Sequence, residues 1–321
     1  MLMGMSDRLD CVVCGSCVVD LLCRPVSLEE PIGSSVLHPV ESVVLTGGGI
    51  TINSGVAMAR LGMKVGVMTY IGDDSWAPVV HDLFREAGID DTYLMTHPTE
   101  STSTTVVMVD GEGERSFFHC VGAPEMLDAN TMLERIDLFA RSNTLLLGYY
   151  SLMPNLESAL PDVLARIRAV GCRTALDAAG AGGTMDPLER ILPHLDFYVP
   201  SLTEASHQTG LADPEQIIRT YRGCAAPGLL GVKLGKKGVL LSPRPDEYVH
   251  IDIVDPPGAV IDTTGAGDCF YAGLLTGLIK GQPIEQAGRL GAAAAACCVT
   301  AIGGAMGVRD YAITSALAGL A

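Results

Sequence analysis

The chain has 321 residues, of which 48% are hydrophobic and only 18% are charged. It is long enough to bury a large core without disulfides or a structural metal, and its composition excludes intrinsic disorder. Its net charge of −16 argues against nucleic acid or an anionic membrane as a partner, because both require a basic protein surface.

Ten cysteines are scattered irregularly along the chain, whereas secreted disulfide scaffolds are short and dense in cysteine. The first ten residues contain Asp7 and Asp10 and do not resemble a signal peptide. We therefore expect reduced thiols and a cytoplasmic protein. Cys11, Cys14 and Cys17 have a spacing that suggests a metal site, but they fall in an apolar stretch typical of a buried strand, where they cannot converge on one ion.

Short apolar runs alternate with helical segments along most of the chain. We expect strands at residues 10–22, 64–71, 145–149, 174–177, 197–199 and 231–234. We expect helices at residues 54–61, 76–87, 156–170, 266–279 and 284–299. Apolar strands that alternate with helices indicate a parallel sheet covered on both faces. The charge-free stretch 290–308 is rich in Ala and Gly, which favours a helix buried in the core over a membrane span.

Residues 27–45 and 99–121 depart from this alternation. Both stretches are rich in Ser, Thr, Val and His, which is typical of exposed antiparallel strands. They can meet as one small sheet, and such a sheet over a parallel-sheet body forms a natural lid for a site at the strand ends. We expect residues 1–321 to form a single α/β domain, with the lid inserted at about 24–46 and 99–121.

The most informative segment, from Asp262 to Gly273, reads DTTGAGDCFYAG and joins a Pro-rich strand region at 254–260 to an apolar helix. Small residues at 265–267 let backbone N–H groups point at one spot in front of the helix, which favours an anion. Asp268 follows in the first helical turn. A carboxylate beside an anion site suits removal of a hydroxyl proton while a phosphoryl group takes the negative charge. The alternative is that Asp268 only caps the helix.

Other phosphate-binding patterns fit the chain poorly. It contains no G-x-x-x-x-G-K-[ST], which excludes a P-loop enzyme. The glycines at 47–49 and 265–267 lack the spacing of a dinucleotide fingerprint, so a nicotinamide-dependent oxidoreductase is weakly supported.

Four segments, in this order along the chain, resemble motifs of the ribokinase-type (PfkB-type) carbohydrate kinase family. Residues 46–62, TGGGITINSGVAMARLG, resemble its G-G-x-x-x-N signature with the helix that ends A-R-L-G. Residues 72–74 fit the G-x-D that follows, and residues 232–238, VKLGKKG, are similar to its nucleotide loop T-L-G-x-x-G. Residues 262–273 resemble its second signature, D-T-x-G-A-G-D-x-F-x-x-G. The resemblance extends over residues 10–308, nearly the whole chain.

This resemblance implies a three-layer α/β/α body with a mainly parallel central sheet and a small antiparallel β lid. It also implies transfer of the γ-phosphoryl group of ATP to a hydroxyl group, usually a sugar hydroxymethyl group, with Mg²⁺. By this analogy Asp268 is the base, and the amides of Gly265, Ala266 and Gly267 form the anion hole.

The resemblance places sugar binding near the N-terminus. The implied residues are Asp20, Gly48, Gly49 and Asn53. Asp20 is expected to end the first strand and to accept two sugar hydroxyl groups, unless it is only a turn residue. The two glycines let the backbone approach the sugar, and Asn53 offers a donor and an acceptor or caps its helix. Four other residues stay ambiguous between substrate contact and a solvated or packing role. They are Arg115, His119, Tyr149 and Tyr150.

The nucleotide and metal sites rest on the same resemblance. The nucleotide residues are Ser201, Lys233, Gly235 and Gly238. Ser201 stands where the family usually has Asn, and a hydroxyl is shorter and makes fewer hydrogen bonds than an amide. Lys233 takes the usual Thr position and reaches either the phosphates or solvent. Glu204 matches a residue that organises Mg²⁺ through water, or it only complements a helix dipole. Asp262 and Thr264 match one side of a monovalent-cation site, which would take K⁺.

We therefore predict an ATP- and Mg²⁺-dependent kinase that phosphorylates a hydroxymethyl group of a sugar or sugar-like substrate. One alternative is a nucleoside kinase of the same family. Another is a catalytically weak regulator that binds a sugar or nucleotide, for which Ser201 is the only support. The exposed edges of the lid allow a homodimer through the lid, as in many relatives.

Overall fold

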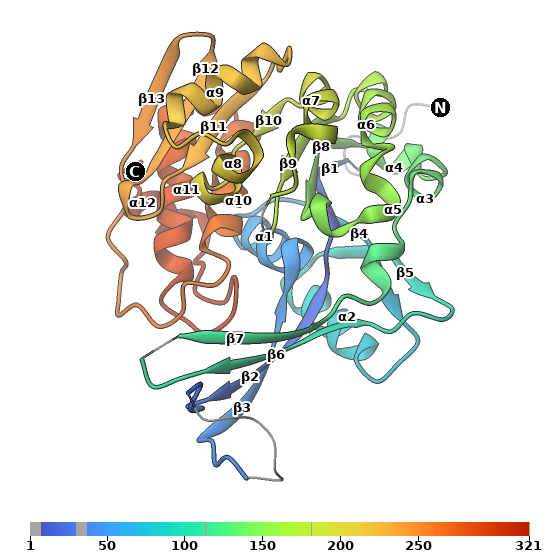
Figure 1. Ribbon diagram of the computed structural model, residues 1–321, viewed down its shortest axis with the longest axis vertical. Helices are drawn as coiled ribbons and strands as arrows, with labels where there is room; N and C mark the ends of the chain where they lie inside the picture. Colours follow the sequence, from blue (N-terminus) through green and yellow to red (C-terminus); the bar gives the residue numbers. More distant parts are fainter. Residues whose placement is uncertain (1–7, 30–36, 113, 181, 321) are drawn as a thin grey trace.

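The computed structural model describes residues 8–29, 37–112, 114–180 and 182–320. Two sheets organise them: a nine-stranded sheet in the body and a four-stranded sheet that projects from one end of it (Figure 1). Residues 1–7, considered above for a signal peptide, and residues 30–36 of the expected lid lie outside the described residues.

The body sheet has the strand order β13-β12-β11-β10-β9-β8-β1-β4-β5. Its strands are β1 (Leu9–Gly15), β4 (Val65–Gly72), β5 (Asp90–His97), β8 (Ser142–Gly148), β9 (Arg173–Asp177), β10 (Phe197–Tyr198), β11 (Leu229–Lys233), β12 (Val239–Arg244) and β13 (Glu247–Ile251). Neighbouring strands from β11 to β5 are parallel, while β12 and β13 form an antiparallel edge. This confirms the mainly parallel central sheet.

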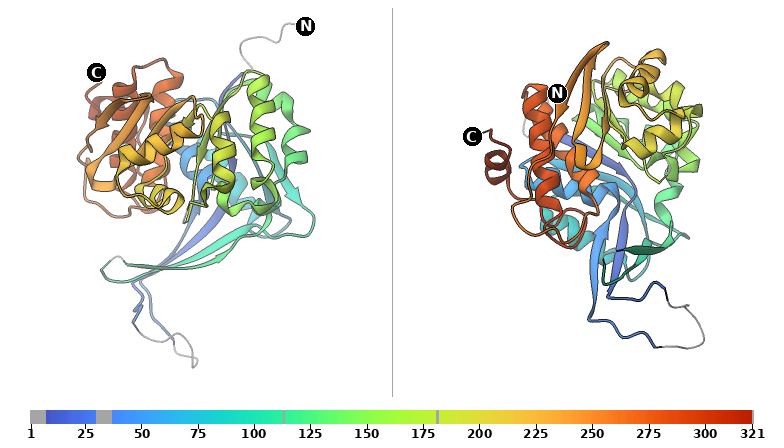
Figure 2. Two further views of the ribbon diagram at one scale, coloured as in Figure 1. Left: turned by 45° about the horizontal axis from the view of Figure 1, so that its top comes forward. Right: turned by 60° about the vertical axis from the view of Figure 1, so that its left-hand side comes forward.

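Helices cover both faces of this sheet (Figure 2). On one face lie α1 (Gly49–Arg60), α2 (Ala77–Ala87), α10 (Ala266–Ile279) and α11 (Ile284–Cys298), with α12 (Tyr311–Leu317) packed on α11. On the other lie α3 (Ala129–Leu133), α4 (Ile136–Ala140), α5 (Pro154–Glu157), α6 (Leu160–Ala169), α7 (Met185–Ile191), α8 (Leu202–Thr209) and α9 (Pro214–Gly223). Strand side chains alternate between two cores, so Cys11 and Val13 enter one while Val12 and Cys14 enter the other.

The prediction of one strand over residues 10–22 is wrong. The run divides into β1 in the body and β2 (Val18–Arg24) in the four-stranded sheet. Gly15, with φ of 127°, ends β1, and a Cβ there would lie 2.2 Å from the carbonyl oxygen of Gly148. The close approach of β8 therefore requires glycine at the point where the chain leaves the body.

The four-stranded sheet, which we call the lid, has the order β3-β2-β6-β7. Its other strands are β3 (Ser42–Gly48), β6 (Ser103–Val109) and β7 (Arg115–Cys120). Strands β2 and β6 are parallel and the other pairs are antiparallel. Asp20 lies in the middle of β2, so its expected position at the end of a body strand is wrong.

Four smaller predictions also need correction. The region 254–260 contains no strand, because its prolines and glycine disfavour a regular ladder. The predicted helix 156–170 is two helices, α5 and α6, and the helix predicted at 54–61 begins at Gly49. The charge-free stretch 290–308 is helical only as far as Cys298.

Two kinds of feature are absent from the described residues. No helix there combines the length and apolar character needed to cross a bilayer. No three His, Cys, Asp or Glu side chains there are grouped to hold a metal ion, and Cys11 and Cys14 lie within β1.

The loop between α11 and α12 is tied to α1 by Arg60. Nη1 of this arginine donates to the carbonyl oxygens of Ala305, Met306 and Val308 at 3.0, 2.7 and 3.2 Å. The same loop donates the N–H of Gly303 to Asp262 Oδ2 at 3.0 Å. The arginine of the A-R-L-G motif therefore holds a loop that borders the start of α10.

Replacing Arg60 with Met should lower the free energy of unfolding by roughly 1–3 kcal/mol, because the apolar stem remains while the carbonyl oxygens lose their charged donor. Urea unfolding measures this change. Arg85→Met is the control, since Arg85 is exposed and should change stability by less than about 0.5 kcal/mol. Equal stability of the two variants would show that the loop does not depend on Arg60.

Candidate active site

A cavity lies between the lid and the start of α1. Lid residues Asp20, Thr105 and His119 line it, together with Gly49 and Asn53 from α1. Asp20 sits opposite Thr105 in the β2–β6 register, which places both side chains on the inner face of the lid. A Cβ at Gly48 would lie 2.2 Å from Asp20 Oδ2, so the glycine makes room for this carboxylate. Burial raises the pKa of Asp20 to about 6.

The four predicted sugar residues Asp20, Gly48, Gly49 and Asn53 therefore line one cavity. The remainder of its lining is mixed. Leu22, Val107, Phe117 and Leu152 provide an apolar wall, and Tyr149 also lines the cavity. Of the four ambiguous residues, Arg115, His119 and Tyr149 reach the cavity, whereas the Tyr150 hydroxyl donates to the Gly182 carbonyl oxygen in the core.

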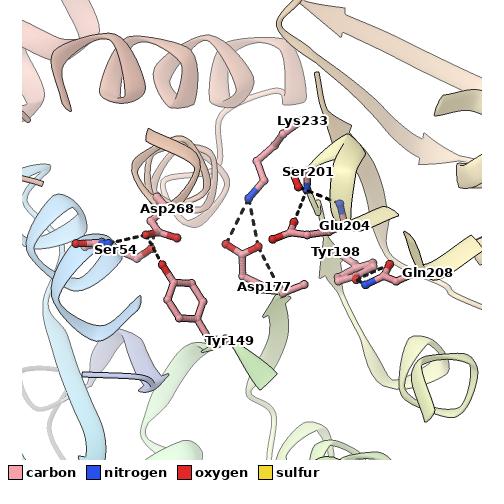
Figure 3. A network of polar contacts seen from close by, with 11 residues as sticks. Ser54, Tyr149, Asp177, Tyr198, Ser201, Glu204, Gln208, Lys233 and Asp268 are labelled. Carbon is pink, nitrogen blue, oxygen red and sulfur yellow. Dashed lines mark hydrogen bonds and ion pairs between the residues drawn. The ribbon is translucent and has the colours of Figure 1, made fainter. Parts of the chain in front are cut away.

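Asp268 is buried in the first turn of α10, only 6% exposed. Its Oδ2 accepts a hydrogen bond from Tyr149 Oη at 2.8 Å (Figure 3). The same oxygen accepts a hydrogen bond from Asn53 Nδ2 at 2.7 Å. Burial raises the pKa of Asp268, although these donors and Lys233 oppose the rise. The alternative that Asp268 caps its helix is wrong, because Gly265 is the N-cap residue.

Small residues form the N-terminal end of α10. Gly265 has a left-handed backbone with φ of 75°, and a Cβ there would lie 2.1 Å from the carbonyl oxygen of Gly304. Only glycine permits this close turn into the helix. The N–H group of Gly267 then belongs to the first helical turn, where helix geometry provides no acceptor for it, while the Ala266 N–H makes only a long hydrogen bond of 3.4 Å to the carbonyl oxygen of Thr263. This end of the helix attracts an anion.

A second cleft continues from Asp268 along the carboxyl ends of β9 and β11. Gly265, Ala266, Gly267 and Asp268 line it, and so do Asp177, Ser201, Glu204 and Lys233. Lys233 Nζ lies 3.2 Å from Asp177 Oδ1 (Figure 3). Burial alone would lower the pKa of Lys233, but the nearby carboxylates, Asp177 foremost, raise it, so the ammonium group stays charged. A Cβ at Gly267 would lie 3.4 Å from this ammonium.

Ser201 and Glu204 form a capping box at the start of α8. The Ser201 N–H donates to Glu204 Oε2 at 2.7 Å, and the Glu204 N–H donates to Ser201 Oγ at 3.3 Å. The serine thus has a defined structural role that asparagine can also fill. Both residues still line the cleft, and Glu204 lies on the same side as Asp177.

An apolar groove adjoins the cleft beyond Lys233. Gly235 and Gly238 line it, together with apolar side chains from β12, β13, α10 and α11. These apolar residues include Val239, Ile251, Val254, Phe270 and Val299. The glycines of the predicted nucleotide loop therefore lie beside the groove, whereas Ser201 lies in the cleft.

The lid contacts the body through Arg115. Its Nη2 lies 2.8 Å from Asp262 Oδ1, and its Nη1 donates to Thr264 Oγ1. Asp262 also accepts the N–H groups of Thr264 and Gly303 at 2.8 and 3.0 Å. The two residues implied for a monovalent cation therefore hold a lid arginine.

Sequence analysis missed one site residue, Asp177, and left Tyr149 undecided together with Arg115 and His119. Asp177 received no role, although an acidic residue at the carboxyl end of a buried parallel strand is a recognisable signal. Tyr149 was undecided because nothing local shows that its hydroxyl reaches Asp268, which is 119 residues away in sequence.

Comparisons with known proteins agree with this architecture. The family described as pfkB family carbohydrate kinase matches residues 8–309. The chain is 31% identical over 258 residues to a ribokinase of Haemophilus influenzae, covering 79% of this chain and 81% of the relative. It is 24% identical over 315 residues to a nucleoside kinase of Methanothermobacter thermautotrophicus, covering 92% and 91%.

A solved structure shares the fold. The ribokinase of Arabidopsis thaliana, complexed with ribose and ATP, superposes with a TM-score of 0.83 at 24% identity and covers 98% of this chain and 100% of that one. The match to the family over nearly all of the chain and the similarity to the Haemophilus ribokinase lead to one conclusion. The chain belongs to the pfkB family of carbohydrate kinases, phosphotransferases that act on an alcohol group.

Proposed function

We propose that this protein transfers the γ-phosphoryl group of ATP to a hydroxymethyl group of a sugar, with Asp268 as the base. One observation carries the proposal. Asp268 accepts a hydrogen bond from Asn53, which lines the cavity between the lid and α1. Asp268 itself lines the adjoining cleft, at the start of α10. A sugar hydroxyl bound in the cavity and a phosphate bound in the cleft would meet at this carboxylate.

The proposed step is an in-line displacement at the γ-phosphorus. The hydroxyl oxygen forms a bond to phosphorus, its proton passes to Asp268, and the bond from phosphorus to the leaving oxygen of ADP breaks. The N–H groups of Gly265, Ala266 and Gly267 stabilise the charge on the transferred group. Lys233, close to Gly267, adds a positive charge on the same side.

The ligands are distributed over three regions. Asp20, Gly48, Gly49 and Asn53 hold the sugar. Gly235 and Gly238 border the groove that takes the adenine and ribose of ATP, because an apolar groove suits a flat base. Ser201 and Lys233 lie on the phosphate side of the cleft.

Kinases of this family use ATP with a divalent metal, for which we propose Mg²⁺. The carboxylate of Glu204 in the cleft fits an ion that prefers oxygen ligands and keeps several waters. Glu204 would hold it through water, and the bound ion would neutralise phosphate charge. The monovalent cation implied for Asp262 and Thr264 fits less well, since Arg115 already contacts both residues, and no step depends on K⁺.

A nucleoside kinase is the second candidate. The apolar wall of Leu22, Val107, Phe117 and Leu152 supports it, because a nucleobase needs apolar surface that a free sugar does not. A catalytically weak regulator is less well supported. The only feature that favoured it was Ser201, and this residue has a structural role in the capping box at the start of α8. The proposed base, Asp268, is also held in place by Asn53.

We further propose a homodimer through the lid in a reducing cytoplasm. All ten cysteines are unpaired, which suits a reducing compartment. The outer face of the lid carries an apolar row across its four strands, formed by Leu45, Leu21, Val106 and Phe118. Phe118 is 53% exposed and Leu45 is 46% exposed, so a second lid could cover this row.

Replacing Asp268 with Asn should leave folding and sugar binding largely intact and lower kcat at least about 100-fold, because the amide cannot accept the hydroxyl proton. A coupled assay of ADP release measures turnover, and the melting temperature checks folding. The matched control is Asp246→Asn at an exposed turn with φ of 60°, which asparagine tolerates. Turnover like the wild type in Asp268→Asn would rule out this mechanism.

A thermal-shift series should distinguish the two substrate classes. Ribose or fructose should raise the melting temperature, since a ligand at 100 times its Kd adds about 2.7 kcal/mol to native stability. Adenosine and cytidine should give no shift. The Asp20→Asn variant should lose the shift with sugar. A shift with nucleosides and none with any sugar would instead favour the second candidate.

The Phe118→Asp variant should separate the proposed dimer, because a carboxylate in an apolar interface loses its hydration. Light scattering after gel filtration should give twice 33.6 kDa for the wild type and 33.6 kDa for the variant. Ile313→Asp is the control, since Ile313 is equally exposed at 54% but lies on α12. A monomeric wild type at micromolar concentration would contradict the dimer.

A further inference from the structure

The backbone at Tyr149 is in a conformation that tyrosine rarely adopts. Directly after β8, it has φ of 62° and ψ of 37°, in the left-handed region. Its N–H donates to the carbonyl oxygen of Asp177 at 3.0 Å, which anchors this turn to the end of β9. Bulky residues remain in such conformations where the surroundings hold them, and these positions cluster at functional sites.

This turn directs the phenol at the carboxylate of Asp268. Tyr149 Oη donates to Oδ2 from the turn after β8 (Figure 3). Asn53 Nδ2 donates to the same oxygen from α1. Among the described residues, no side chain or backbone donor contacts Oδ1 of Asp268. Two donors from separate elements on one oxygen fix the rotation of the carboxylate and leave the other oxygen available.

We infer that Tyr149 is a positioning residue: its hydroxyl holds Oδ2 of Asp268 so that Oδ1 accepts the proton of the sugar hydroxyl. This inference rests on the proposed role of Asp268 as the base. Tyr149 lines both the sugar cavity and the phosphate cleft, so its ring lies where the two ligands would meet.

Tyr149 also favours the ionised form of the base. Burial raises the pKa of Asp268, and hydrogen bonds from Asn53 and Tyr149 lower it because they stabilise the carboxylate. Burial, followed by the charge of Asp268, raises the pKa of Tyr149 well above its ordinary value, so the phenol remains a donor.

The other groups that act on Asp268 come from several elements. Lys233 of β11 favours its charged form, whereas Glu204 of α8 disfavours it. Asp177 at the end of β9 and Cys269 of α10 also interact with it. Removal of the Tyr149 hydroxyl leaves all of these groups in place, which isolates its effect on the base.

Tyr150 offers a matched comparison within the same turn. It is fully buried, and its hydroxyl donates to the Gly182 carbonyl oxygen at 2.9 Å. It lines neither the sugar cavity nor the phosphate cleft. A structural role shared by both tyrosines would affect stability, whereas a role in positioning the base belongs to Tyr149 alone.

The test compares Tyr149→Phe with Tyr150→Phe. Tyr149→Phe keeps the ring and loses only the hydroxyl, so kcat should fall about tenfold, the cost of one hydrogen bond to a charged group. The KM for sugar should stay within about twofold. In a plot of kcat against pH, the acid limb should move to higher pH. The carboxylate of Asp268 loses a hydrogen-bond donor in this variant, which raises its pKa.

Tyr150→Phe should lower the melting temperature and leave the acid limb unchanged. In an Asp268→Asn background, Tyr149→Phe should change the residual turnover by less than about twofold, since the two residues act as a unit. A further tenfold loss in that background, or an unshifted acid limb in Tyr149→Phe, would overturn the inference while Asp268 remains the base. If Asp268→Asn retained full turnover, the base assignment itself would fail, and the role of Tyr149 with it.

Discussion

Burial of the Asp268 carboxylate is the constraint on which the site depends. Removing an ionised carboxylate from water costs several kcal/mol unless donors and opposite charge replace the lost hydration. Asn53 of α1, Tyr149 after β8 and Lys233 of β11 provide that replacement. These three groups come from separate parts of the fold, so the body has to assemble before the carboxylate can remain charged in this place. As the base that we propose, Asp268 is therefore oriented before a substrate binds.

The same constraint explains how an acidic protein can handle a polyanion. The net charge of −16 gives no general attraction for phosphate. The cleft itself is locally positive where it meets α10. Lys233 is buried next to the first turn of this helix, and the N–H groups of that turn also favour negative charge. Asp177 fixes the ammonium group in position at the end of β9. The phosphate binding that we propose for the cleft therefore depends on a few oriented groups and not on the surface as a whole.

The lid completes this arrangement from the opposite side. Gly15 ends β1 where it packs closely against β8. The chain then leaves the body and continues as β2, the lid strand that carries Asp20. The period-two alternation of β2 and β6 then points Asp20 and Thr105 inward and leaves apolar side chains outside. Arg115 connects the far lid strand to Asp262 and Thr264, next to the turn that begins α10.

The sequence by itself determined those features of the fold and of the candidate site that depend on local sequence motifs. These patterns involve residues only a few positions apart in the sequence. They predict the turn at 265–267, the helix after it, the parallel sheet and the motif that contains Asn53. The tertiary structure alone decided the division of 10–22 into two strands, because β1 pairs with β4 and β8 in the body whereas β2 pairs with β3 and β6 in the lid. It also decided the partners of Asp268, since Asn53 is 215 residues away, and the pairing of Lys233 with Asp177, 56 residues away. Local propensity carries no information about which distant side chain fills a given space, and packing of the whole chain settles that choice.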